Sequence, residues 1–206
     1  YKDIEWISDT LIDAGMNADK EFIDTNVGQN GVNNIISHKK INVNGKTYTL
    51  IFVAAIGSYK KQWYSNFDPG TSTTHRGFIY AKNHVNLQLA KYIQKYNLHD
   101  VENTKILLTG HSRGAATVNL LAAELIKNQN LAKAENIYTY GFATPNTTSL
   151  SERHEEKFER IFNIVNPEDF VTKVVPTKWE YGRYGTTYTL PSKFNSGRGY
   201  VDGEYV

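Results

Sequence analysis

The chain has 206 residues, of which 40% are hydrophobic and 21% are charged, and its formal net charge is +2. These values indicate one globular domain. Because the basic residues form no stripe in the sequence, they exclude a nucleic-acid-binding surface. The absence of cysteine excludes disulfides, thiolate catalysis and cysteine-ligated metals, and no apolar run is long enough to predict a membrane-spanning helix. A chain without Cys and rich in Asn, Thr and Tyr favours an exported bacterial protein, secreted or at the cell surface. Because it starts at Tyr1, we expect a mature or trimmed fragment.

Helical and strand patterns alternate along the chain. Apolar residues at helical spacing predict one or two helices in residues 1–24. Asn44-Gly45, between alternating segments, predicts a hairpin whose second strand ends in Leu50–Ile56, an apolar run that we expect to be buried on both faces. The other predicted elements are loops at 25–34 and 59–76, helices at 78–96, from Ala115 and at 151–160, and strands at 105–109, 136–143, 161–165 and 186–190.

This alternation predicts the fold class. Strands that alternate with helices form an α/β fold around a mostly parallel sheet with flanking helices. No internal repeat or long linker divides the chain. We therefore expect a single domain over residues 1–206, in which residues 1–40 form an N-terminal appendage of helix and loop.

One motif indicates chemistry. The residues Gly110–Gly114 read GHSRG and match the pattern G-x-S-x-G. They follow a predicted strand and open a predicted helix, which is the setting of a nucleophile elbow. Glycine suits so sharp and crowded a turn, and the N–H groups at the helix start would face negative charge developing at Ser112. We predict that Ser112 is a nucleophile. The alternative is a Ser that caps the helix after a tight turn.

A nucleophilic Ser needs a base and an acid that orients the base. In the fold that carries such an elbow, the acid follows a later strand. Asp169 comes directly after the predicted strand at 161–165 and is the predicted acid, with Glu168 in reserve. The alternative for Asp169 is an ordinary turn residue after Pro167.

An oxyanion hole needs two donors close to the nucleophile. The backbone N–H of Arg113, the residue after the nucleophile, is the first predicted donor. The second is expected in a loop after an earlier buried strand, where Gly57-Ser58 lies. Ser58 would donate through its N–H or its hydroxyl group; the alternative is an ordinary Gly-Ser turn that ends the strand.

Together these pieces resemble the class 3 lipases, the fungal-lipase-like family of α/β hydrolases, over roughly residues 47–191. The resemblance implies that Ser112 is the nucleophile, that Asp169 is the acid and that Ser58 and Arg113 form the oxyanion hole. It also implies hydrolysis of acyl esters without a cofactor. The matching segments are Gly57-Ser58, Trp63, His75–Phe78, Gly110–Gly114, Phe142–Pro145, Asn166–Asp169 and Val174–Pro176.

Two features depart from the family pattern. Ile56 stands where the family usually has Arg before the Gly-Ser step. The family's catalytic His follows the acid, but this chain has no His after Asp169. We therefore expect the base in a C-terminal part outside this chain. The alternative is an upstream His: chain order opposes His154, the elbow points His111 away from the nucleophile, and His75 is explained as a packed loop residue.

The family carries a lid in the loop after the oxyanion residue. In this chain Lys60 and Lys61 stand beside Trp63 and Phe67, which suits an amphipathic flap that opens at a lipid interface. The alternative is that the aromatic residues pack on the sheet edge while the lysines are solvated.

The expected function is that of a serine carboxyl-ester hydrolase, a lipase or esterase acting on acylglycerols or related lipid esters. Its expected partners are this substrate and, transiently, a lipid interface, with no nucleic acid, cofactor or metal. The alternatives are a phospholipase, a feruloyl or other carbohydrate esterase of the same fold, or a catalytically incomplete binding module.

Overall fold

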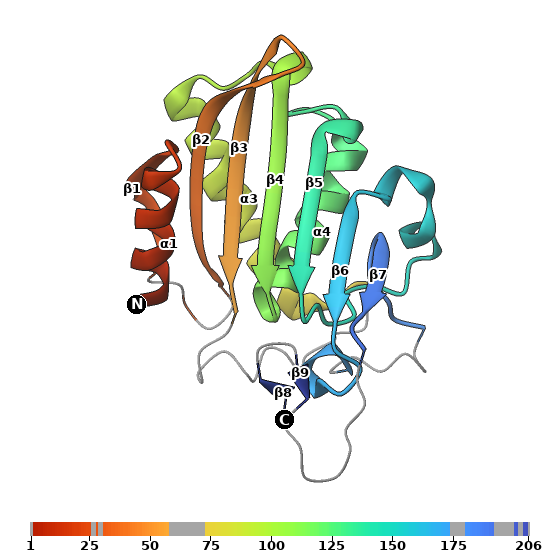
Figure 1. Ribbon diagram of the computed structural model, residues 1–206. Helices are drawn as coiled ribbons and strands as arrows, with labels where there is room; N and C mark the ends of the chain where they lie inside the picture. The colour runs from red at the N-terminus through yellow and green to blue at the C-terminus, as the bar shows by residue number, and fades with distance from the viewer. Residues whose placement is uncertain are drawn as a thin grey trace.

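A seven-stranded sheet organises the computed structural model, which describes residues 2–25, 28, 31–57, 73–173, 180–191, 200–201 and 204–205. Its strand order is the chain order, from β1 to β7 (Figure 1). The first three strands pair antiparallel, and β3 to β7 pair parallel. The strands are β1 (Asn17–Asp24), β2 (Asn33–Val43), β3 (Lys46–Ile56), β4 (Thr104–His111), β5 (Ile137–Phe142), β6 (Ile161–Val165) and β7 (Thr186–Thr189), with a separate antiparallel pair of β8 (Tyr200–Val201) and β9 (Glu204–Tyr205).

The turn between β2 and β3 is the hairpin that the sequence predicts. Asn44 and Gly45 have φ of 51° and 79°, which is the left-handed backbone that a two-residue hairpin turn of this kind requires. Val43 pairs with Lys46 across the turn. The Gly45 N–H also donates to Asn42 Oδ1 at 2.9 Å, which stabilises the turn locally.

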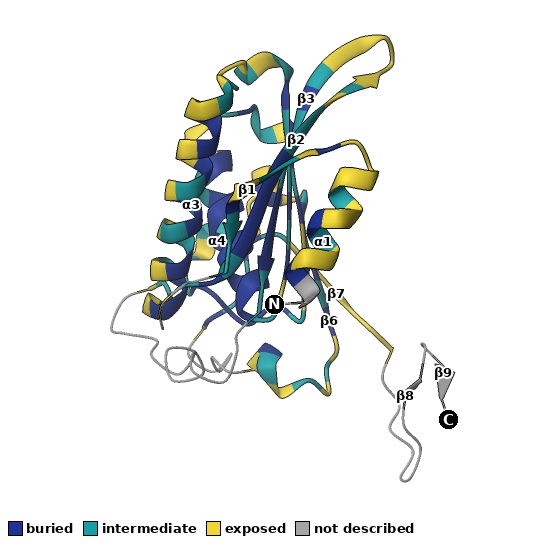
Figure 2. Ribbon diagram, turned by 90° about the vertical axis from the view of Figure 1, so that its left-hand side faces the viewer, coloured by how far each residue is buried: buried dark blue, intermediate teal, exposed yellow. Residues whose placement is uncertain are grey.

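Two long helices cover one face of the sheet. α3 (Arg76–Tyr96) connects β3 to β4, and α4 (Arg113–Asn128) connects β4 to β5. Both lie on the same face, whereas α1 (Lys2–Asp13) lies on the opposite side beside β1 and β2 (Figures 1 and 2). Each of the two long helices buries the apolar stripe that its sequence predicts: Val85, Leu89, Tyr92 and Ile93 in α3, and Val118, Leu121, Ala122 and Leu125 in α4.

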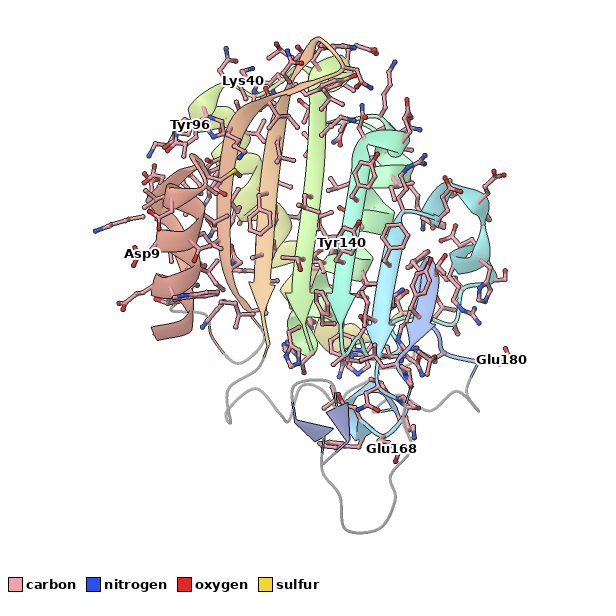
Figure 3. The ribbon with its side chains drawn as sticks, viewed as in Figure 1. Asp9, Lys40, Tyr96, Tyr140, Glu168 and Glu180 are labelled. Carbon is pink, nitrogen blue, oxygen red and sulfur yellow. The ribbon has the colours of Figure 1, made fainter. Side chains whose placement is uncertain are left out.

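The opposite face of the sheet is only half-buried. In β3, Ile51 and Val53 are fully buried on the helix side, whereas Leu50 and Phe52 are partly exposed. The expectation that Leu50–Ile56 is buried on both faces is therefore wrong. Tyr140 of β5 is 41% exposed on this side of the sheet (Figure 3) and stacks on Phe162 of β6 with ring centroids 5.1 Å apart.

The N-terminal segment is part of the sheet. Residues 2–13 form the predicted helix, but Asn17–Asp24 is a strand where a second helix was an option, and β1 and β2 extend the sheet. Residues 1–40 are therefore not an appendage of helix and loop. Long-range packing explains the difference, because Phe22 is buried edge-on against Tyr92 of α3, with ring centroids 4.8 Å apart.

Residues 151–160 do not form the predicted helix. They make two short 3₁₀ turns, Ser151–His154 and Glu156–Phe158. Only Phe158 in this segment is buried, so no apolar helical face supports a longer helix. The predicted strands that follow, at Ile161–Val165 and Thr186–Thr189, are confirmed.

Candidate active site at the carboxyl edge of the sheet

Ser112 stands at the sharp turn between β4 and α4. Its backbone has φ 55° and ψ −124°, a region that side-chain-bearing residues rarely adopt. Its side chain makes no capping hydrogen bond to the helix. The geometry therefore does not support the helix-capping alternative, and Ser112 is half-buried at the end of the strand. A strained Ser between a strand and a helix has the geometry of a nucleophile elbow.

Three glycines allow the chain to crowd around this turn. A Cβ atom at Gly110 would lie 2.5 Å from the Gly114 carbonyl carbon, and one at Gly114 would lie 2.1 Å from the Ala55 carbonyl oxygen. A Cβ atom at Gly57 would lie 2.9 Å from the His111 carbonyl oxygen and 3.1 Å from Ser112 Cβ. The end of β3 therefore packs directly against the elbow, at the place where an oxyanion loop is needed.

The N-terminus of α4 faces the same place. The first intrahelical hydrogen bond runs from the Ala116 N–H to the Ser112 carbonyl at 3.1 Å. The N–H groups of the preceding helical residues, beginning with Arg113, therefore lie at the free positive end of the helix. Arg113, the first predicted oxyanion donor, is the first residue of this helix. Ser58 lies outside the described residues.

The Arg113 side chain has a position that the sequence did not predict. It is fully buried, and its Nη2 donates to the Gly77 carbonyl at 3.0 Å, while its Nε donates weakly to the Gly31 carbonyl at 3.4 Å. Its guanidinium group lies 5.8 Å from the centre of the Phe78 ring. Burial lowers the pKa of Arg113 to about 10, so the group stays charged at neutral pH. The side chain thus ties the elbow to the start of α3.

Asp169 lies in a turn after β6. Its Oδ1 accepts the Val171 N–H at 2.9 Å, and its backbone carbonyl accepts the Thr172 hydroxyl at 2.7 Å. These bonds hold the half-buried carboxylate in a fixed turn. The reserve candidate Glu168 is exposed at the lower edge of the molecule (Figure 3). Because β4 and β6 are parallel, their carboxyl ends bring Ser112 and Asp169 to the same edge of the sheet, separated by β5.

The structure describes all the histidines that were weighed as upstream bases. His75 is fully buried and stacks on Phe78 with ring centroids 4.0 Å apart, as expected for a packed loop residue. His154 is exposed in a 3₁₀ turn. His111 ends β4 with an exposed side chain. None of these observations assigns a base to Ser112.

Metal sites, membrane-spanning helices and cavities are the other features to consider in the described part of the chain. No three His, Cys, Asp or Glu side chains within it gather closely enough to hold a metal ion. Within the same ranges, no helix has the length and apolar character needed to cross a bilayer. A cavity of about 310 Å³ lies between α3 and α4, and neither Ser112 nor Asp169 lines it. The residues of the predicted lid, Lys60, Lys61, Trp63 and Phe67, fall outside the described ranges.

The mostly parallel sheet, its flanking helices and the strand–Ser–helix elbow define an α/β-hydrolase fold. The chain belongs to the class 3 lipase family, whose family model matches residues 42–179. No curated protein matches the chain in sequence.

Solved lipase structures share the fold at low sequence identity. A fungal lipase in complex with an inhibitor has 17% identity and a TM-score of 0.61, over 84% of this chain and 66% of that one. The triacylglyceride lipase of Rhizomucor miehei has 19% identity and a TM-score of 0.59, over 85% and 66%. Lipase II of Rhizopus niveus has 14% identity and a TM-score of 0.56, over 78% and 63%. The chain therefore spans less than two thirds of the length of these lipases.

Proposed function

We propose that the protein is a serine carboxyl-ester hydrolase that cleaves acyl esters of lipids through a Ser112 acyl-enzyme. The observation that carries this proposal is the backbone of Ser112, strained at φ 55° with no capping bond and enclosed by glycines at positions 57, 110 and 114. A turn strained in this way presents the Ser hydroxyl at the carboxyl edge of the sheet, where α/β folds bind their ligands. The family and its lipase neighbours support the same reaction class.

In the proposed reaction, Ser112 Oγ gives its proton to a base and attacks the acyl carbonyl carbon. The negative charge that develops on the carbonyl oxygen is stabilised by the Arg113 N–H at the helix terminus and by a donor from Ser58. The bond to the alcohol then breaks, and the alcohol takes the proton from the base. Water then gives its proton to the base and attacks the carbonyl carbon of the acyl-enzyme. The bond to Ser112 Oγ breaks, Ser112 takes the proton from the base, and the carboxylic acid is released.

Asp169 is the proposed acid that orients the base. Its turn is fixed by the bonds to Val171 and Thr172, which keeps its carboxylate near the carboxyl end of β6. The base is left to experiment, because none of the six histidines of the chain follows Asp169. Replacing His75, His111 and His154 singly by Ala tests whether one of them is the base. Among variants that stay folded by circular dichroism, only the one that lacks the base should lose the reactivity of Ser112.

The test of the proposed function is labelling of the natural full-length protein by a fluorophosphonate, read by intact mass and peptide mapping. We expect one adduct, on Ser112, together with hydrolysis of a short-chain nitrophenyl ester. Ser112→Ala should lose both while keeping its circular dichroism spectrum. A folded protein that takes no adduct and hydrolyses no ester would overturn the proposal and favour the binding-module alternative.

The substrate class, the contact with a lipid interface and the cellular location are also proposals. We expect acylglycerols to be cleaved faster than phospholipids or feruloyl esters, because the family is one of lipases. Comparing turnover of a short acyl ester below and above its solubility limit tests contact with a lipid interface, and a smooth curve without a jump would argue against it. We also propose an exported location, which is in keeping with a composition without Cys and rich in Asn, Thr and Tyr. Fractionation of the source cells tests that location.

A further inference from the structure

Two fully buried amide side chains connect the helix of the nucleophile to the strand of the acid. Asn119 lies on α4, and its Nδ2 donates to Oδ1 of Asn163 on β6 at 3.0 Å. Neither side chain is exposed to solvent. Burying two amides in this way is favourable only if their polar atoms are paired. The reaction proposed above uses neither residue.

The pairing of Asn119 is complete. Its Nδ2 also donates to the Tyr184 carbonyl at 2.9 Å, and its Oδ1 accepts the Thr147 hydroxyl at 2.9 Å and the Tyr184 N–H at 3.2 Å. Both donors and both acceptor sites of the amide are therefore occupied. Because every bond depends on where α4 sits, the network is satisfied in one position of the helix and loses several bonds in any other.

Asn163 extends the network to the last strand of the sheet. Its Nδ2 donates to the Tyr184 carbonyl at 2.9 Å and to the Thr186 carbonyl at 3.3 Å. Thr186 begins β7, which pairs with β6, and Tyr184 precedes that strand by two residues. The two amides thus bring together α4, β6 and the approach to β7 at one buried point.

The strand between them leaves room for this connection. Gly141 of β5 lies beneath the network, and a Cβ atom there would lie 3.6 Å from Asn163 Oδ1, 3.4 Å from Ala115 Cβ and 2.5 Å from Thr144 Oγ1. A Cβ atom at this position would displace the Thr144 hydroxyl, whereas its contact with Ala115 of α4 would be an ordinary one. Glycine keeps the space between β5, Thr144 and the two amides free of a side chain.

The amides lie close in sequence to the two ends of the site. Asn119 follows Ser112 by seven residues, about two helical turns, and Asn163 precedes Asp169 by six residues. The chain between Ser112 and Asn119 is helix, and the chain from Asn163 to Asp169 is strand followed by a short turn. A displacement of α4 relative to β6 would therefore change the separation of Ser112 and Asp169.

We infer that Asn119 and Asn163 are positioning residues that set the placement of the nucleophile relative to the acid. The inference rests on the proposed function. Apolar side chains at these positions would fill the space but would let the helix slide, because apolar contacts are not directional. A displacement of about 1 Å at reacting groups can reduce the rate on the order of 100-fold.

The test uses Asn119→Ala, Asn163→Ala and the double variant in the full chain. The matched control is Val118→Ala, a fully buried neighbour on the same helix that makes only apolar contacts. For each protein, stability is measured by urea denaturation. Fluorophosphonate labelling of Ser112 and the kcat and KM of ester hydrolysis are then measured where the protein is fully folded.

We expect each Asn variant to label at least about tenfold more slowly than wild type, with lower kcat and with KM within about twofold. The double variant should lose little more than either single variant, because both remove the same connection. Val118→Ala should lose comparable stability but keep the labelling rate within about twofold. If an alanine variant does not fold, Asn119→Ser or Asn163→Ser takes its place with the same expectation.

Two results would overturn the inference, and they have different consequences for the proposed function. Asn variants that are labelled as fast as Val118→Ala would show that the amides serve stability alone, and the proposed function would stand. A wild-type protein that takes no label at Ser112 would overturn the proposed function and, with it, the positioning role.

Discussion

The backbone N–H of Ser112 donates to the carbonyl of Phe142 at 2.9 Å. This bond joins the elbow to the end of β5. One residue later the Ala143 N–H donates to the Ile164 carbonyl at 2.8 Å, which joins β5 to the strand that precedes Asp169. Ala143 makes this second bond with a φ of 51°, so a second side-chain-bearing residue in the left-handed region lies between the two halves of the site.

The strain at Ser112 predicts a stability difference between two inactive variants. Ser112→Gly should be more stable than Ser112→Ala by about 1 kcal/mol, because only glycine adopts this backbone without steric cost. Both variants should lose ester hydrolysis. Urea denaturation at neutral pH measures the difference, and equal stabilities would contradict the strained geometry.

The contact between Gly114 and Ala55 predicts a large effect of a small substitution. Gly114→Ala would place a Cβ atom 2.1 Å from the Ala55 carbonyl, so β3 and the elbow would have to separate. We expect a loss of at least about 3 kcal/mol of unfolding free energy. Gly28→Ala is the control, since a Cβ atom there meets nothing within 4 Å, and it should change stability by less than about 0.5 kcal/mol.

The neighbouring carboxylates Glu168 and Asp169 predict unequal effects of the same change. Asp169→Asn should lower kcat by up to about 10⁴-fold, because the amide no longer stabilises a charged base. Its fold should persist, since the new side chain keeps an oxygen to accept the Val171 N–H. Glu168→Gln is the control and should change kcat by less than about twofold, as that side chain is exposed. A larger effect at Glu168 would reverse the assignment of the acid.

Partial burial of His38 predicts a pH dependence of stability. Burial lowers the pKa of His38 below its usual 6.5, and the nearby charge of Lys40 lowers it further. Its Nδ1 lies 2.7 Å from the Tyr92 hydroxyl, and its ring lies against Tyr96. The unfolded chain therefore binds a proton more readily than the folded protein. The stability associated with His38 is complete above pH 6.5 and is lost as the pH falls through the lower pKa of the folded state.

Urea denaturation at pH 7.5, 6.5 and 5.5 measures this dependence. His38→Gln should flatten the decrease between pH 6.5 and 5.5, because the new side chain does not titrate. His154→Gln, at an exposed position, should leave the slope of the wild type unchanged. A wild-type stability that does not fall over this range would contradict the prediction.

Sequence patterns predicted those elements whose structure depends on residues close to one another in the chain. Asn44-Gly45 specified its hairpin because two residues with positive φ suffice for that turn. The elbow was found because glycines, a strand and a helix accompany Ser112. The strand at Asn17–Asp24 was missed because its formation depends on pairing with β2 and on burial of Phe22 under α3. Periodicity within the segment does not contain that information.

The polar supports of the site were also missed. Asn119 lies in the middle of a helix and Asn163 in the middle of a strand, and neither belongs to a motif. Arg113 was identified for its backbone N–H, but nothing in the sequence indicates that its side chain is buried against Gly77 and Phe78. Such partners are distant in the chain, so only the packed structure identifies them.

The identity of strand order and chain order has a consequence for synthesis on the ribosome. Each strand from β2 onward pairs with the strand made just before it, so the sheet can grow as the chain emerges. Asp169 follows Ser112 by 57 residues, which is about 6 s of translation at a rate of about 10 residues per second. During that interval the nascent chain contains Ser112 without its proposed acid. Under the proposed function, hydrolytic activity therefore arises late in translation.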